Sequence, residues 1–272
     1  MDVDRLFSVS GKVALVTGGS RGIGRMIAEG LVRSGARVYI ASRKADACDQ
    51  TAAELSSYGE CVSSPADLSG LEGAEQLAGA IAASEPVLHI LVNNAGATWG
   101  ARLEEYPDSA LDKLWGVNLK APFHLTRLLL PQLRAAARPD DPARVINIGS
   151  ANGTAVPRMF NVDVPPGAPS TENYAYSATK AAIHMLTRHL AHRLAREHIT
   201  VNAIAPGPFE SKMMEFALGS EAGRTAIAAA VPLGRIGTPE DMAGAVLYLA
   251  SRAGSYLTGA IIPVDGGSTS HG

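Results

Sequence analysis

The sequence has few of the residues that mark disulfide-rich, secreted or metal-binding proteins. Two cysteines occur in 272 residues, and they form neither a CxxC pair nor a metal-ligand spacing. We interpret Cys48 and Cys61 as reduced thiols of a cytosolic protein. The seven histidines include His184, His189 and His192 on one expected helix. Because no spacing gives three ligands with a carboxylate partner, we expect no catalytic metal.

Long apolar runs and blocks of one charge are also missing. No stretch of about 18 apolar residues occurs, so no membrane span is expected. The first ten residues include Asp2 and Asp4 and no apolar stretch, which does not fit a signal peptide. The 24 basic and 26 acidic residues give a net charge of −2, which argues against nucleic-acid and anionic-membrane partners. These absences together predict a cytoplasmic protein.

Hydrophobic residues make up 46% of the chain, enough for a sizeable core. Short β-branched runs predict seven strands: Val13–Thr17, Val38–Ala41, Cys61–Ser63, Ile90–Asn93, Val145–Ile148, Thr200–Ala205 and Ile261–Val264. Several of these runs are apolar almost throughout, as strands covered on both faces must be.

Segments of helical period separate these strands. In the first, four apolar residues fall on one face: Ile23, Met26, Ile27 and Leu31. The other expected helices are Leu71–Ala83, Ser109–Ala137, Tyr176–Glu197 and Pro239–Ala250. This alternation predicts one α/β domain over residues 1–272, a doubly wound Rossmann-type sheet of about seven parallel strands with helices on both faces.

Two stretches interrupt the alternation. The proline-rich Thr154–Asn173 follows the fifth strand, and Pro206–Pro232 follows the sixth. Both leave carboxyl ends of strands, where open α/β sheets bind ligands. We interpret residues 154–173 as an inserted loop and residues 206–232 as a lid on the substrate side, with plain surface insertions as the alternative. The lid contains a short apolar stretch: Met213, Met214, Phe216 and Leu218. These side chains suit an adaptable cover over an apolar substrate, or ordinary core contacts.

A glycine-rich turn follows the first strand and opens the first helix. Its glycines permit a tight turn and a close approach of the backbone to a pyrophosphate, while the helix amino end offers free N–H groups. The candidate cofactor-binding residues here are Gly18, Ser20, Arg21, Gly22, Ile23 and Gly24. A turn with a purely structural role is the alternative.

Three motifs occur together in a set order. The glycine spacing is Gly18-xxx-Gly22-x-Gly24, followed by Asn93-Asn94-Ala95-Gly96 after the fourth strand and Tyr176-Ser177-Ala178-Thr179-Lys180 at the head of a helix. Together they resemble the short-chain dehydrogenase/reductase family, in its compact single-domain branch. The resemblance extends from about Gly11 to Gly267 and implies a nicotinamide-dependent oxidoreductase.

The end of the second strand bears on the choice of cofactor. A carboxylate there would bind the 2′-hydroxyl of NAD, but the segment reads Ala41-Ser42-Arg43-Lys44, with no acid. Arg43, with Arg21 in the glycine turn, is suited to a 2′-phosphate. We therefore predict NADP(H), with Ser42 and Arg43 among its contacts. Exposed arginines that only aid solubility are the alternative.

The resemblance implies further cofactor contacts. They are Asp67, Leu68, Asn94, Ala95, Gly96, Tyr176, Lys180, Pro206 and Gly207. Asp67 resembles the family's adenine contact, although a simple helix N-cap is also possible. Pro206-Gly207 resembles the segment that lies against the nicotinamide carboxamide.

The proton that accompanies hydride transfer needs a donor near the substrate oxygen. Tyr176 and Lys180 are four residues apart and thus on one helical face. A tyrosine pKa starts near 10, and the Lys180 charge is expected to lower it; the resemblance implies that Lys180 also holds the nicotinamide ribose. Tyr174 lies about 240° around the helix from Lys180. We assign Tyr174 to packing or to the wall of the substrate pocket.

Two further residues match the family's catalytic set. Ser150, at the end of the fifth strand, matches a second hydrogen-bond donor to the substrate oxygen. Its gap of 26 residues to Tyr176 is longer than usual in the family, and residues 154–173 account for the excess. Asn118 matches the asparagine that supports a water linking the lysine to solvent. Capping or kinking of its helix is the alternative role for Asn118.

The expected function is an NADPH-dependent carbonyl reductase. Within the family, the stretch Asn93–Ala101 and the tail Ile262–Gly267 look most like 3-oxoacyl-(acyl carrier protein) reductases of the rhamnolipid-pathway type. This implies reduction of a 3-oxoacyl thioester to the 3-hydroxyacyl form, in a homotetramer. Alternatives are a dehydrogenase of a polyol, sugar or steroid alcohol, or a non-catalytic NADP-binding scaffold. Enoyl reduction is disfavoured, because that branch spaces its tyrosine and lysine more widely.

Overall fold

A parallel sheet forms the centre of the structure, a computed structural model that describes residues 2–156 and 173–270. Its strands are β1 (Val13–Thr17), β2 (Arg37–Ala41), β3 (Cys61–Ser63), β4 (Ile90–Asn93), β5 (Ala143–Ile148), β6 (Ile199–Pro206) and β7 (Ile261–Val264). Their order is β3-β2-β1-β4-β5-β6-β7, and every neighbouring pair is parallel. The seven predicted strands are confirmed, each within two residues at either end.

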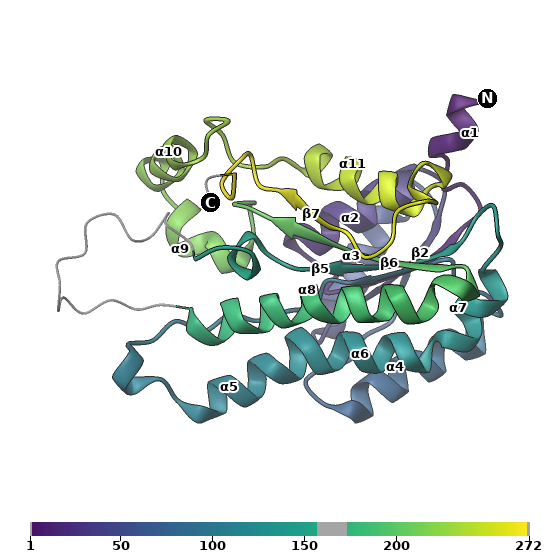
Figure 1. Cartoon of the computed structure of the whole chain (residues 1–272), viewed down its shortest axis with the longest axis horizontal. Coiled ribbons are helices and arrows are strands. Elements are labelled where there is room, and N and C mark those ends of the chain that lie inside the picture. The colour runs from purple at the N-terminus through teal and green to yellow at the C-terminus, as the bar shows by residue number, and fades with distance from the viewer. Residues whose placement is uncertain (1, 157–172, 271–272) are drawn as a thin grey trace.

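Helices cover both faces of the sheet (Figure 1). One face packs against α2 (Gly22–Arg33), α3 (Ala45–Leu55) and α11 (Pro239–Ala250), and the other against α4 (Leu71–Ser84), α6 (Ala121–Leu128) and α8 (Tyr174–Leu194). Successive strand side chains point to opposite faces, so Val16 lies in the first core and Leu15 in the second. The predicted doubly wound α/β fold is confirmed.

The expected helix over residues 109–137 is interrupted. It consists of α5 (Asp108–Trp115), a π-helical turn at Gly116–Lys120, then α6 and α7 (Leu130–Ala136). Proline stands in the first turn of both α6 and α7, where its missing N–H costs nothing. The sequence reading also missed α3 and the short α1 (Val3–Phe7).

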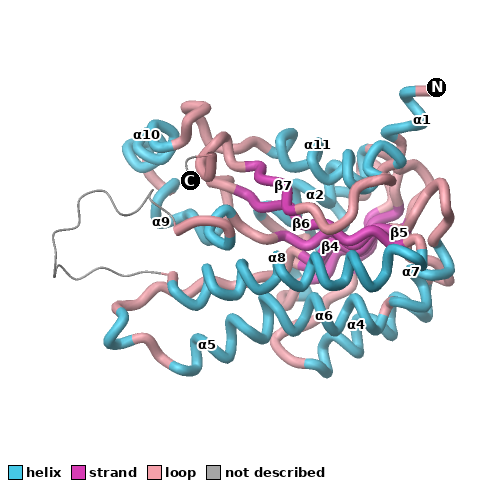
Figure 2. The backbone as a smooth tube through the Cα atoms, in the orientation of Figure 1, coloured by secondary structure: helices cyan, strands magenta, loops and turns pink. Residues whose placement is uncertain are grey.

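The two expected loops differ in what the structure describes. Of the inserted loop, residues 157–172 lie outside the described residues. The lid segment contains a 3₁₀ turn at Lys212–Met214, α9 (Glu215–Leu218) and α10 (Glu221–Ala230), which lie at the same end of the molecule as the start of α8 (Figure 2). Phe209 fixes the beginning of the segment, because it is buried and pairs with Gly237 in an isolated bridge.

The described residues contain neither a candidate membrane span nor a candidate metal cluster. None of the helices there is long and apolar enough to cross a membrane. Within the same ranges, no group of three or more histidine, cysteine, aspartate or glutamate side chains is arranged to hold a metal ion.

Candidate active site

The turn between β1 and α2 has the shape that its glycines predict. Gly18 and Gly22 adopt positive φ angles of 66° and 52°, which favour glycine. Arg21 is the N-cap residue of α2 and its side chain makes no capping hydrogen bond. The first amides of a 12-residue helix therefore remain available to an anion. Arg21 and Arg43 are exposed, and neither forms a salt bridge within the described ranges. A doubly charged phosphate fits this setting.

The segment after β4 is bound to the end of β1. Thr17 Oγ1 accepts hydrogen bonds from the amides of Asn94 (3.0 Å) and Ala95 (2.9 Å). Asn94 Nδ2 donates to the Thr17 carbonyl at 2.8 Å. Because β1 pairs with β2 on one side and β4 on the other, this junction is the topological switch point, where open α/β sheets bind dinucleotides.

The residues expected to contact the cofactor after β2 and β3 make contacts of their own in the structure. Asp67 comes four residues after β3 ends, and its carboxylate accepts a hydrogen bond from the Ser69 amide at 3.0 Å. The N-cap residue of α4 is Gly70, so the alternative reading of Asp67 as a helix N-cap is wrong. Leu68 is buried, and the Ser42 hydroxyl donates to the Lys44 carbonyl at 3.3 Å.

Tyr176 and Lys180 lie on one face of α8, as their spacing predicts. The Lys180 ammonium nitrogen is 5.6 Å from the centre of the Tyr176 ring. It donates to the Ile148 carbonyl at the end of β5, at 2.7 Å. Burial lowers the pKa of Lys180 to about 8, because the charged form loses its hydration. Lys180 is thus a buried cation, tied to β5 and near the phenol.

The side chain of Ser150 is hydrogen-bonded to that of Tyr176. Burial raises the pKa of Tyr176, and the bond with Ser150 acts in the opposite direction. The net upward shift corrects the expectation that the nearby lysine would lower this pKa, because loss of hydration outweighs the polar contacts. Tyr176 is accordingly a protonated phenol at neutral pH, which suits a proton donor.

Asn118 lies in the π-helical turn and links two parts of the site. Its Nδ2 donates to the Ala97 carbonyl and to Thr179 Oγ1, both at 3.0 Å, and its Oδ1 accepts from the Ala97 amide at 2.9 Å. The side chain therefore joins the segment after β4 to α8, directly beside Lys180. These bonds fall in the turn where the helix widens to the π-helical form.

Comparison with known proteins gives the same picture. A family model described as "Enoyl-(Acyl carrier protein) reductase" matches residues 18–269. The rhamnolipids biosynthesis 3-oxoacyl-[acyl-carrier-protein] reductase of Pseudomonas aeruginosa is 49% identical over 96% of this chain and 97% of its own length. Gluconate 5-dehydrogenase of Gluconobacter oxydans is 33% identical, with 97% of each chain covered. A solved structure, described as "Pseudomonas aeruginosa RhlG/NADP active-site complex", aligns with a TM-score of 0.90 at 48% identity, covering 97% of this chain and 99% of that one.

The chain belongs to the short-chain dehydrogenase/reductase family. It is therefore an oxidoreductase. The description of the family model names enoyl reduction, whereas the relatives above are named for ketone reduction or alcohol oxidation. The resemblance inferred from the three motifs is confirmed.

In this family member, Tyr174 has a packing contact. It is the first residue of α8, and its ring meets that of Tyr106 edge to face, with 5.9 Å between the ring centres. Tyr106 in turn donates from its hydroxyl to the Trp99 carbonyl at 3.1 Å. The two tyrosines thus connect the start of α8 to the segment after β4, in agreement with the packing role expected for Tyr174.

Sequence reasoning missed Ser211. A Cβ atom built on Gly22 would lie 3.1 Å from Ser211 Cβ, so the lid segment rests directly on the glycine turn. A cavity of about 380 Å³ lies beside this contact, lined in part by Gly22, Glu210 and Ser211. The one available signal was the position of Ser211 shortly after Pro206-Gly207, which does not reveal a contact with a turn almost 190 residues earlier.

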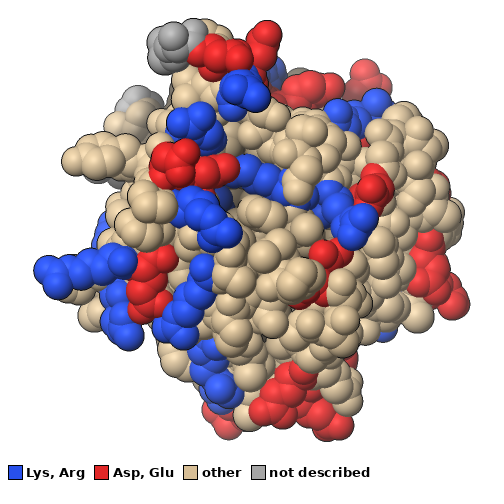
Figure 3. Space-filling view, turned by 90° about the vertical axis from the view of Figure 1, so that its right-hand side faces the viewer, with Lys and Arg blue, Asp and Glu red and all other residues tan. Residues whose placement is uncertain are grey.

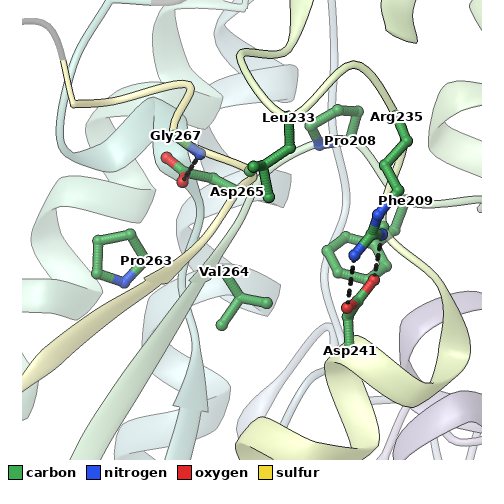
Figure 4. Close-up of a pocket in the computed structure, with 11 residues that line it drawn as sticks. Pro208, Phe209, Leu233, Arg235, Asp241, Pro263, Val264, Asp265 and Gly267 are labelled. Atoms are coloured by element: carbon green, nitrogen blue, oxygen red, sulfur yellow. Dashed lines mark hydrogen bonds and ion pairs between the residues drawn. The ribbon is translucent and has the colours of Figure 1, made fainter.

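A second cavity, of about 270 Å³, lies between the start of the lid segment and the end of β7 (Figure 4). Pro208 and Phe209 line it, together with the pair formed by Arg235 and Asp241, whose Nη1–Oδ2 distance is 2.6 Å. None of Ser150, Tyr176 and Lys180 lines this cavity, so it is not the place of the proposed chemistry.

The apolar stretch of the lid is divided. Leu218 is buried, whereas Phe216 is 76% exposed and Met213 is 36% exposed. Leu218 therefore has the core role considered as an alternative. Met213 and Phe216 are exposed, and the lid role of this segment stays a prediction.

Proposed function

We propose that this protein is an NADPH-dependent carbonyl reductase that acts on 3-oxoacyl thioesters. The observation that carries the proposal is the group formed by Tyr176, Lys180 and Ser150 at the carboxyl end of β5. Two relatives support it: the 49% identical protein is named a 3-oxoacyl-[acyl-carrier-protein] reductase, and the similar solved structure is described as an NADP complex.

The residues of the glycine turn and the switch point would hold the cofactor, and Arg21 and Arg43 would bind its 2′-phosphate. When bound, NADPH supplies the hydride that reaches the carbonyl carbon. Tyr176 donates its phenolic proton to the carbonyl oxygen as negative charge develops there. Ser150 donates a hydrogen bond to the same oxygen, and the Lys180 charge stabilises the tyrosinate that remains.

Tyr176→Phe tests the proton donor. We expect turnover of a 3-oxoacyl thioester to fall by about 10²–10⁴-fold, because the ring keeps its packing but has no proton to give. NADPH affinity, measured by titration of cofactor fluorescence, should stay within about threefold of the parent value. Near-normal turnover in this variant would contradict the assignment.

A substrate panel separates the named alternatives. Acetoacetyl thioesters, gluconate and other polyols, and a steroid alcohol are assayed with both nicotinamide cofactors under the same conditions. We expect the highest kcat/KM for the thioester with NADPH. A higher value for a polyol would favour the dehydrogenase alternative, which the gluconate 5-dehydrogenase relative also supports. Cofactor binding without turnover of any compound would favour the scaffold.

We also propose a cytoplasmic homotetramer. Large apolar side chains are exposed on the outer helices of both faces: Leu111 on α5, Phe123 on α6 and Met185 on α8, which lie side by side in Figure 1, and Tyr248 on α11 across the sheet from them. Exposed apolar surface of this kind suits subunit contacts. Light scattering after gel filtration should give four times the mass of the chain, and a monomer mass would refute the tetramer.

A further inference from the structure

One face of α8 runs along the end of β5. Four residues on this face, three or four apart, are Tyr176, Lys180, His184 and Thr187. Lys180 donates to the Ile148 carbonyl, and Thr187 Oγ1 accepts from Asn147 Nδ2 at 2.9 Å. His184 meets the residue after β5, Gly149. His184 lies on α8 between Lys180, which belongs to the proposed active site, and Thr187, which bonds to β5. It has no part in the chemistry described above.

The His184 ring is buried against the turn that carries Ser150. Only 5% of the residue is exposed, and the ring is hydrogen-bonded to the backbone of Gly153. Its Nε2 has no hydrogen-bond partner within the described ranges. The polar contact with the Gly153 backbone is therefore made by the other ring nitrogen, Nδ1. Nε2 faces Gly149, since a Cβ atom built there would lie 2.1 Å from it.

The turn is seated on α8 at both of its ends. At its far end, a Cβ atom on Gly153 would lie 2.6 Å from the Lys180 carbonyl carbon. Between the two glycines, the Ser150 hydroxyl accepts a hydrogen bond from the Asn152 amide at 3.1 Å, and the Ser150 carbonyl accepts from the Gly153 amide at 2.9 Å. A shift of the turn relative to α8 would therefore move Ser150 relative to Tyr176.

The charge state of the ring fits this place. Burial lowers the pKa of His184 to about 4, and the positive charges of Lys180 and Arg188 act in the same direction. The hydrogen bond with Gly153 acts against this lowering. At neutral pH the ring is uncharged, so it packs beside the buried Lys180 ammonium without adding a second cation.

We propose that His184 is a positioning residue, which holds residues 149–153 on α8 so that Ser150 remains hydrogen-bonded to Tyr176. The proposal has a structural part and a kinetic part. The kinetic part rests on the proposed reductase function, whereas the structural part does not.

Hydrogen exchange tests the structural part. In His184→Leu, which removes the bond to Gly153, amide exchange at Asn152, Gly153 and Thr154 should rise about tenfold or more. His184→Asn, whose Nδ2 can stand near the position of the lost Nδ1, should restore most of the protection. Ile183→Val is the matched control, because it shortens a buried side chain next to His184 on the same helix. It should leave exchange in the turn unchanged.

Unchanged exchange of the turn in His184→Leu would overturn the proposal, as would equal increases along all of α8 and β6. If His184→Leu does not fold, Gly149→Ala takes its place, because a methyl group there pushes against the same ring. The same local increase is then expected, and its absence would again overturn the proposal.

A double-mutant cycle tests the kinetic part. His184→Leu should lower kcat for the ketone about tenfold in the parent chain, but by less than about twofold in a Ser150→Ala background. In alcohol oxidation at pH 7, where the rate follows the small tyrosinate fraction, His184→Leu should be slower than the parent, since the Ser150 bond no longer lowers the pKa of Tyr176. A purely structural role would lower activity equally in the parent and Ser150→Ala backgrounds, and this result would overturn the proposal. If the parent chain reduces no ketone, the proposed function fails and the exchange experiment alone decides the role of His184.

Discussion

Lys180 combines deep burial with a polar anchor, and this combination has a consequence for pH dependence. Its Nζ donates to the Ile148 carbonyl, and within the described ranges no carboxylate forms an ion pair with it. With a pKa of about 8, the ammonium form predominates at lower pH, falls to half at the pKa and is lost as the pH rises further. In contrast, the pKa of Tyr176 lies above its ordinary value. The lysine, not the tyrosine, therefore sets the first alkaline limb.

We expect kcat/KM for ketone reduction to be level from about pH 6 to 7.5 and to fall through about pH 8. The loss of the Lys180 charge leaves the developing tyrosinate without its cation. Initial rates in a buffer series at constant ionic strength measure this limb. In alcohol oxidation, which consumes the tyrosinate form, the profile should instead rise with pH until the lysine charge is lost. A reduction profile that stays level beyond pH 9.5 would contradict the role given to Lys180.

Arg43 offers a test of cofactor choice at a single exposed side chain. Arg43→Ala should raise the KM for NADPH about tenfold, because the substitution removes one charge-assisted contact that solvent partly screens. The KM for NADH should not change, because NADH has no 2′-phosphate to lose. Lys44→Ala is the matched control, since Lys44 is the next residue, equally basic and also exposed. An equal effect of the two substitutions on NADPH would show that general surface charge, not a specific contact, favours this cofactor.

The residue scale also shows what the sequence alone could reveal. Tyr176, Lys180 and Asn118 are recognisable because their chemistry and spacing are local properties of the chain. Ser211 and His184 are not, because each matters through a contact with a turn far away in sequence. In the sequence, His184 is only one of three histidines on an expected helix with no metal spacing, and its place against Gly149 shows which segment it packs on.

Among the helices, α11 has the most complete capping. Thr238 Oγ1 accepts from the Asp241 amide, and the Asp241 carboxylate accepts from the Thr238 amide at 2.8 Å. Arg235 adds a bidentate pair with the same carboxylate, at 2.6 and 3.0 Å. Hydrogen bonds with Arg235 and Thr238 hold the pKa of Asp241 well below its usual range. The carboxylate thus stabilises the fold above its unfolded pKa near 4.

Thr238→Ala should lower the free energy of unfolding by about 0.5–2 kcal/mol, the usual cost of losing an N-cap side chain. Denaturant titration at pH 7 measures this change. Asp241→Asn should destabilise at pH 7, but the difference from the parent should shrink progressively as the pH falls from about 4 towards the low folded pKa, because the unfolded parent then binds a proton that the folded parent resists. Glu240→Gln is the control, because Glu240 is exposed in the same helical turn and has no part in the capping box. A constant difference at all pH values would contradict the electrostatic account.

The elements differ in how far the sequence defines them. The strands were predicted closely because buried parallel strands are apolar at every position, a pattern that few other segments share. The helix over residues 109–137 was not predicted as broken, because its π-helical turn coincides with bonds from Asn118 to Ala97 and Thr179, residues outside the helix that the local pattern does not reveal. Helix α3 has a mixed composition, and its buried face becomes recognisable only once β2 and β3 lie beneath it.

At the scale of the whole molecule, ion pairs connect several elements at the end opposite the active site. Figure 3 shows this end, with Lys and Arg side chains interspersed among Asp and Glu. Asp141, just before β5, accepts from Lys12 Nζ at 2.6 Å and from Arg144 Nη2 at 3.1 Å. Both cations are almost fully buried. They also bond to the carbonyls that end α11, namely those of Leu249, Ala250 and Ser251. One carboxylate therefore pairs with two cations that join the starts of β1 and β5 to the end of α11.

Asp141→Asn should cost more than a surface charge pair, because it leaves two buried cations side by side without a counter-ion. Breaking a buried pair costs about 3–5 kcal/mol, whereas an exposed pair is worth about 0–1 kcal/mol. Since Asp141 keeps part of its side chain in solvent, we expect a loss of about 2–3 kcal/mol in the free energy of unfolding.

Asp140→Asn is the matched control, because Asp140 is the preceding residue, exposed and without a salt bridge within the described ranges. It should change stability by less than about 0.5 kcal/mol. Because these charges lie at the amino ends of the strands, kcat of the folded Asp141→Asn variant should remain that of the parent, and equal stability of the two variants would show that solvent already screens both buried cations.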